Sequence, residues 1–190
     1  MGRLDQLLAN YKSHLTIPLR NNLPLSQRVW FLVYPPEEER RLRNRFDDFA
    51  QATRSVSLGW HEIRLTGTFA DWIDTFDDEE KEEIKNDQEL IMSYARKGFC
   101  RFLAKILTRQ AARVSPDQAT RTVFALTGLM ELFDFIDVSS VIDTLSKDFP
   151  GILAVFFPGE RDGNSYRFLN ARTAWDYLAV PIVSEATNTP

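Results

Sequence analysis

The chain has 190 residues, 44% of them hydrophobic and 12% aromatic, so it can bury about two-thirds of its unfolded surface in one compact domain. Its 23 basic and 27 acidic side chains are well mixed and give a net charge of -4, which argues against a protein held to nucleic acid by bulk charge. The one cysteine, Cys100, excludes an internal disulfide and a thiolate metal site, and no apolar run approaches the roughly 18 residues that span a bilayer. We therefore expect a soluble, cytoplasmic protein without membrane contact.

The first predicted element is an amphipathic helix over residues 2–16, which Pro18 and Pro24 prevent from continuing. Its apolar side chains recur on one helical face and are Leu4, Leu7, Leu8, Tyr11 and Leu15. This stripe can pack on its own domain or dock as a helix in a groove of another protein. The sequence favours packing on the same domain and leaves docking as the alternative.

A strand, a turn and a helix come next. The run "RVWFLVY" (28–34) is typical of a strand buried on both faces of a parallel sheet, and it stops at Pro35 and Pro36. The next segment, 37–56, has three glutamates in its first turn, where the helix dipole favours acids. It predicts one helix whose apolar stripe is Leu42, Phe46, Phe49 and Val56.

The segment "WHEIRLT" (60–66) alternates like a strand, with His61, Ile63 and Leu65 on one face. Thr68 and Asp71 then predict a capping box at the start of a short helix. Residues 77–87 are mostly acidic and lysine side chains, and they predict a solvated connection.

A long helix is predicted over residues 89–114, weakened locally by Gly98. It carries a ribbon of cations at intervals of four residues: Lys97, Arg101, Lys105, Arg109 and Arg113. The ribbon can be a solvated helix face, which the net negative charge favours, or it can meet phosphates or an acidic partner surface. If the ribbon binds, we expect a protein partner before nucleic acid.

The rest of the chain alternates strands with a helix. Segments 122–128 and 152–157 read as buried strands, 137–149 as a helix, and 165–171 and 177–182 as extended, with 165–171 returning antiparallel along the sheet edge. Strands that alternate with helices predict βαβ units. We therefore expect one α/β domain over residues 1–190, with a mainly parallel, mixed-edge sheet flanked by helices in a Rossmann-like or P-loop-like layout.

No phosphate-binding loop accompanies that layout. The stretch "GERDGNS" (159–165) lacks the P-loop spacing and its lysine, and the residues after it alternate like a strand. Gly159, Asp162 and Gly163 instead predict a hairpin turn. No glycine-rich dinucleotide fingerprint comes after any predicted strand.

The candidate catalytic groups have structural interpretations that are at least as good. His61 is expected to be partly buried and hydrogen-bonded, His14 exposed, and Cys100 an inert, partly buried thiol. The acids between Asp77 and Glu83 fit a solvated surface, and Asp134, Asp137 and Asp143 fit helix capping as well as a ligand site. We expect no catalytic constellation, no metal and no cofactor.

Four blocks of the sequence are informative together: "QRVWFLVYPPEEERRLRNRFDDFA", "GWHEIRLT" with "FADWI", "ILAVFFPGE", and "SYRFLNARTAWDYLAVPI". Taken in this order, they resemble the BrxB family of the BREX bacteriophage-exclusion systems. The resemblance covers most of the chain, and its C-terminal block is the most specific part. Residues 77–115 show much less of the family pattern, so the resemblance does not extend to the basic ribbon.

The resemblance implies a cytoplasmic subunit of a multicomponent antiviral defence system that confers phage resistance. Such a system also contains an ATPase, a DNA adenine methyltransferase and a PglZ-type member of the alkaline phosphatase superfamily. We expect a non-enzymatic adaptor that acts through protein–protein interaction, with the PglZ-type protein or the ATPase as its partner. The alternatives are a nucleic-acid-binding accessory that uses the basic helix, and a degenerate nucleotide-binding protein.

The aromatic and basic residues of the C-terminal block allow two interpretations. Trp, Tyr and Arg dominate interface hot spots, and buried aromatics can equally close the core of a sheet. We expect core packing for Trp175 and leave both possibilities open for Tyr166 and Arg172.

Overall fold

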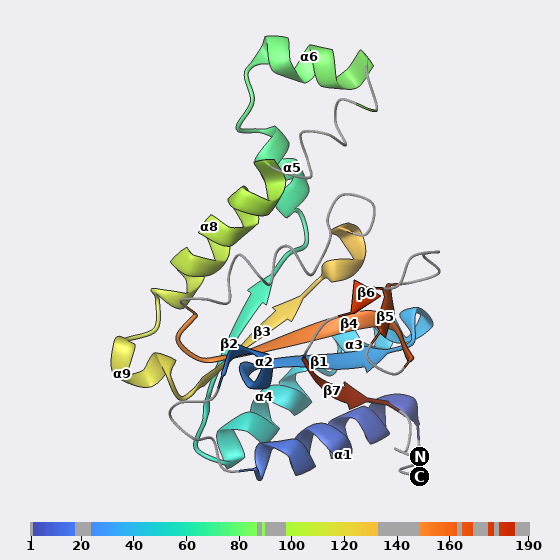
Figure 1. Cartoon of the computed structure of the whole chain (residues 1–190), viewed down its shortest axis with the longest axis vertical. Helices are drawn as coiled ribbons and strands as arrows, with labels where there is room; N and C mark the ends of the chain where they lie inside the picture. The colour runs from blue at the N-terminus through green and yellow to red at the C-terminus, as the bar shows by residue number, and fades with distance from the viewer. Residues whose placement is uncertain are drawn as a thin grey trace.

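A computed structural model of the chain describes residues 2–17, 24–86, 89, 98–132, 149–162, 165–168, 175–176 and 179–184. Within these ranges a mainly parallel sheet has helices on both of its faces (Figure 1), which confirms the expected α/β class. The body of the sheet is parallel and has the order β2-β3-β4-β1-β7. Its strands are β1 (Val29–Tyr34), β2 (Gly59–Arg64), β3 (Thr122–Thr127), β4 (Ile152–Asp162) and β7 (Val180–Val183).

The predicted buried strands are confirmed. Every residue of β1 and of β3 is buried, because helices cover both faces and each strand has a neighbour on each side. The chain passes from β1 to β2 at the far edge of the sheet and returns strand by strand through β3 to β4. This path leaves β1 in the interior of the sheet, between β4 and β7.

One face of the sheet is covered by α1 and α4, which lie below the strands in Figure 1. The elements on this part of the path are α1 (Arg3–Leu15), α2 (Leu25–Arg28), the 3-10 turn η1 (Pro36–Glu38), α3 (Glu39–Arg43) and α4 (Phe46–Ser55). The single helix predicted over 37–56 is wrong, because the chain turns at Asn44 and Arg45 between α3 and α4. Val56 lies beyond the end of α4 and is exposed.

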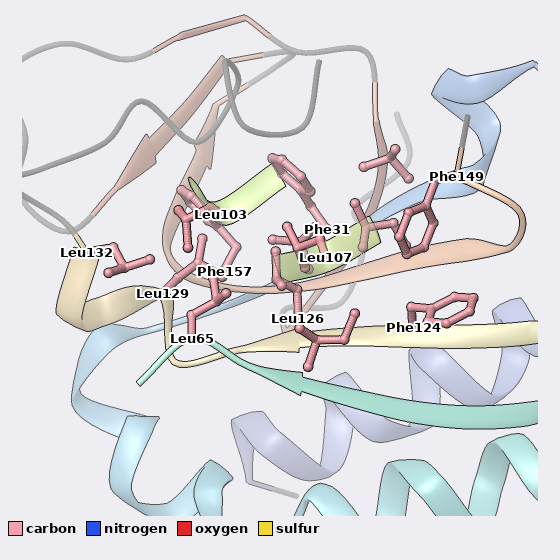
Figure 2. Close-up of a cluster of buried hydrophobic side chains, with 14 of the residues drawn as sticks. Phe31, Leu65, Leu103, Leu107, Phe124, Leu126, Leu129, Leu132, Phe149 and Phe157 are labelled. Carbon is pink, nitrogen blue, oxygen red and sulfur yellow. The ribbon is translucent and has the colours of Figure 1, made fainter. Parts of the chain in front are cut away.

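The opposite face is covered chiefly by α8, whose Leu103 and Leu107 pack in one apolar cluster with Phe31 of β1 and Phe157 of β4 (Figure 2). The elements between β2 and β4 are α5 (Thr68–Ile73), α6 (Asp78–Asn86), α8 (Cys100–Ala111), α9 (Pro116–Ala119) and the 3-10 helix η3 (Leu129–Leu132). Gly98 allows the chain to pass close to α5, since a Cβ there would lie 3.0 Å from the Trp72 ring. The part of the predicted long helix over 90–97 and the helix predicted over 137–149, apart from Phe149, lie outside the described residues.

A predicted helix start and a predicted connection are corrected. The N-cap of α5 is Gly67 and no side chain caps the helix, so the predicted capping box of Thr68 and Asp71 is wrong. The Thr68 hydroxyl instead donates to the Leu65 carbonyl at 2.6 Å. The predicted connection over 77–87 contains the helix α6. Its capping box is made by Asp77 and Glu80, whose side chains accept each other's backbone N–H at 2.8 and 3.1 Å.

An antiparallel extension continues from the end of β4. Residues 159–162 pair with β5 (Ser165–Phe168), and β5 pairs with β6 (Trp175–Asp176). The antiparallel return of this segment is therefore confirmed. Its position at the sheet edge is wrong, because β5 pairs with β4 beyond the point where β4 leaves β1 at Tyr34.

The hairpin is confirmed, but Gly159 is not part of its turn. Gly159 lies inside β4 opposite Phe168, and a Cβ at this position would overlap the Arg167 carbonyl oxygen. A side chain here would collide with the backbone of the paired strand. The glycine serves strand pairing rather than a ligand.

Candidate interaction surface

The apolar stripe of α1 is part of the core. Leu4, Leu7, Leu8, Tyr11 and Leu15 are buried and pack with Trp30, Phe49 and Ile182 of the sheet and α4. Packing on the same domain is therefore confirmed. The alternative, that Leu4, Leu7, Leu8 and Tyr11 dock on another protein, is wrong because these side chains are already covered.

A polar contact supports the position of α1. The Tyr11 hydroxyl lies 2.6 Å from the Thr53 hydroxyl of α4, and the Thr53 hydroxyl also donates to the Phe49 carbonyl at 2.8 Å. Burial raises the pKa of Tyr11. The helix is thus held by a satisfied buried hydroxyl pair as well as by apolar packing.

Tyr166 of β5 is also a core residue. It is 1% exposed, and its ring packs edge-on against Phe31 with centroids 4.6 Å apart. Burial raises the pKa of the Tyr166 phenol. Of the two possibilities left open for Tyr166, core packing is therefore the one that holds, and a partner contact is excluded. Arg172 lies outside the described residues, and so does the side chain of Trp175.

Unlike the α1 stripe and Tyr166, the described part of the basic ribbon is exposed to solvent. Arg101, Lys105 and Arg109 of α8 are exposed, and so is Arg113 just beyond the end of the helix. None of the four forms an ion pair with another residue in the described ranges. Lys97, the first member of the predicted ribbon, lies outside the described residues.

A buried polar cluster lies at the carboxyl end of β1. The Tyr34 hydroxyl donates to one carboxylate oxygen of Glu39, and Arg43 Nε donates to the other at 3.0 Å. Arg43 also reaches Glu131 of η3 at 3.8 Å, and Glu131 accepts the Gly67 N–H at 3.1 Å. Both oxygens of Glu39 are thus engaged within the fold.

This cluster has an electrostatic consequence for Tyr34. Burial, followed by the Glu39 carboxylate, raises the pKa of the phenol well above its usual value. The sequence interpretation missed the cluster, treating Glu39 only as an acid in a first helical turn. The sequence does contain a sign of this cluster. Tyr34 and Glu39 are close in sequence on either side of the Pro35-Pro36 turn, which brings the end of a strand and the start of a helix together.

The histidines differ from expectation in detail. His14 is half-buried rather than exposed, because its ring stands edge-on to Trp30 with centroids 4.5 Å apart, and burial lowers its pKa. His61 is partly buried as predicted and packs against Phe124, but the structure gives its buried Nε2 no hydrogen-bond partner within the described ranges.

The other candidate groups have the placements expected of structural residues. Cys100 is a buried thiol in α8, and the acids Asp77 to Glu80, Glu82 and Glu83 are exposed. The described residues contain no group of three or more metal-ligating side chains that could hold an ion. Asp134, Asp137 and Asp143 lie outside the described residues.

No protein-family model, curated protein or solved structure matches this chain. Among the helices in the described ranges, none is both long enough and apolar enough to cross a membrane.

Proposed function

We propose that the protein is a non-enzymatic, cytoplasmic adaptor of a BREX anti-phage defence complex, and that it binds the PglZ-type protein or the ATPase. The observation that carries the proposal is the ordered resemblance of four sequence blocks to the BrxB family. The blocks fall on β1 with α3 and α4, on β2 with α5, on β4, and on β5 to β7. They therefore fall on every described strand of the sheet except β3.

The use of polar groups within the fold supports an adaptor rather than an enzyme. Tyr34 and Glu39 satisfy each other at the strand ends, where α/β proteins often bind ligands. Tyr11 and Thr53 do the same under α1. The exposed cations Arg101, Lys105 and Arg109 of α8 form no ion pair within the described ranges, and such a row suits contact with another macromolecule.

The test is affinity capture of the tagged protein from cells that express the other BREX subunits. The extract is treated with nuclease, and retained proteins are identified by mass spectrometry. We expect one subunit, the PglZ-type protein or the ATPase, in a fixed molar ratio to the tagged chain. Loss of every BREX subunit after nuclease treatment would refute the adaptor, and turnover of a nucleotide or phosphoester that one point substitution abolishes would refute the non-enzymatic role.

A further inference from the structure

The basic strip, defined here as Arg101, Lys105, Arg109 and Arg113, faces away from the sheet. α8 buries Cys100, Leu103, Leu107 and Ala111 against the sheet side. A step of four residues advances about 40° around a helix and about 6 Å along it. The strip therefore runs along the outer side of α8 with one cation about every 6 Å.

Charge is segregated around this strip. Residues 90–116 contain six lysines and arginines and no aspartate or glutamate, although the whole chain has more acids than bases. Elsewhere in the described ranges, several cations have an acidic partner, as in Arg45 with Asp5 at 2.7 Å and Lys85 with Glu82 at 3.3 Å. The strip differs because nearby sequence offers it no counter-charge.

The arrangement is unfavourable for the isolated helix. Successive strip residues are like charges at i and i+4, which repel each other on a helix surface. A local pattern that works against its own element and has no compensation within the fold is typical of a functional surface.

The spacing and surroundings favour a protein helix over nucleic acid as the occupant. Acids at i and i+4 on a partner helix also repeat about every 6 Å, so they match the strip residue for residue. The outer side of α8 offers Thr108 and Ala112 between the cations and no exposed aromatic for base stacking. The exposed acids of α6 lie beyond the N-terminal end of α8 (Figure 1) and would repel a long polyanion that continued past it.

We propose that the basic strip is the docking surface for an acidic helix of the partner protein. The inference rests on the proposed adaptor function and assigns its contact surface. The strip pairs Arg101, Lys105 and Arg109 with carboxylates spaced four residues apart on that helix. Because the pairs lie at the surface, salt weakens the contact.

Charge reversal tests the strip in the full chain. The strip variant carries Arg101→Glu, Lys105→Glu and Arg109→Glu. The control variant carries Lys12→Glu, Arg40→Glu and Arg54→Glu, which are exposed cations of α1, α3 and α4 without ion pairs in the described ranges. Both variants change the net charge by the same amount, and circular dichroism with thermal unfolding checks that each is folded.

After nuclease treatment, we expect the strip variant to capture about one-tenth or less of the amount of BREX partner that the wild type captures. The control variant should capture as much as the wild type. Equal capture by the wild type and the folded strip variant would overturn the strip and leave the adaptor standing. No capture even by the wild type would overturn the adaptor and the strip with it. Should the strip variant misfold, cross-linking decides the question on the unmodified chain.

Zero-length cross-linking identifies the chemistry of the partner surface. A carbodiimide condenses a lysine amine with a carboxylate that touches it, with loss of water, so a contact at Lys105 becomes an amide that mass spectrometry can locate. We expect Lys105 to join an aspartate or glutamate of the captured partner and Lys12 to join none. Lys105→Arg should keep capture and lose the cross-link. A captured partner joined only through other lysines, or strip-dependent binding of a single-stranded oligonucleotide with no protein cross-link, would overturn the proposal.

Discussion

At the scale of single residues, Tyr34 shows how a buried phenol and a buried carboxylate depend on each other. Tyr34→Phe removes the donor to Glu39 and leaves one oxygen of a buried carboxylate unpaired. We expect the free energy of unfolding to fall by about 1.5–3 kcal/mol, the range for hydrogen bonds to charged groups. Tyr11→Phe is the matched control, because Thr53 keeps its bond to the Phe49 carbonyl and the expected loss is about 0.5–1.5 kcal/mol. Urea unfolding of both variants measures the difference, and equal losses would contradict a special role for the Tyr34–Glu39 pair.

Gly159 makes a second prediction at this scale. Gly159→Ala places a Cβ against the Arg167 carbonyl in the paired strand, so β4 and β5 must separate or shift. We expect a loss of about 1–3 kcal/mol in urea unfolding. Gly67→Ala is the comparison, because nothing lies within 4 Å of that Cβ and only the φ of +80° opposes the alanine. A Gly159→Ala variant as stable as the wild type would show that the hairpin does not pair in this register.

At the scale of elements, α1 is a structural helix rather than a detachable docking segment. Leu7 of α1 is fully buried between the helix and the sheet. Leu7→Ala should therefore lower the free energy of unfolding, measured in urea, by about 2–5 kcal/mol. Ile17, just beyond the helix, is 55% exposed, and Ile17→Ala should change stability by no more than about 0.5 kcal/mol. Similar small effects of both substitutions would mean that α1 leaves the sheet in solution.

The elements also show what sequence patterns can predict. The α1 stripe and the strands β1 and β3 were predictable, because apolar spacing and continuous buried runs are set by local sequence. The break at Asn44 and Arg45 was not, since residues 37–56 keep one helical stripe across it. In the structure Arg45 instead reaches Asp5 of α1 at 2.7 Å and Asp48 at 2.9 Å. Contacts with α1 therefore compete with helix continuity, and such tertiary contacts leave no mark in a local pattern.

The candidate surface was predictable only in part. The four-residue recurrence of cations marked the basic strip, because helical spacing alone places those residues on one side. Sequence could not show which aromatic residues of the C-terminal block would be covered. Tyr166 is buried because β5 folds back on β4 and brings it against Phe31, a pairing between distant parts of the chain. The same limit hid the cluster that joins Tyr34, Glu39 and Arg43 to Glu131.

At the scale of the whole molecule, buried tyrosines set an alkaline limit to stability. The fold raises the pKa of Tyr11, Tyr34 and Tyr166 above the usual value of 10.0, so above about pH 10 the unfolded chain releases protons that the folded chain retains. Stability contributed by these neutral phenols is therefore fully present below pH 10 and is lost as pH rises. We expect a cooperative rise in tyrosinate absorbance that coincides with loss of near-ultraviolet circular dichroism. Gradual ionisation of all tyrosines near pH 10 in a folded protein would contradict this burial.

For the molecule as a whole, we propose that the α/β sheet serves as a scaffold for an exposed contact rather than for a reaction. The most direct test is the mass of the complex formed when the purified chain is mixed with the purified PglZ-type subunit or ATPase, measured by light scattering at low and high salt after nuclease treatment. We predict a defined heteromeric mass with one of the two at low salt, and dissociation as salt screens the strip. Unchanged masses of the separate proteins in every mixture and at every salt concentration would contradict it.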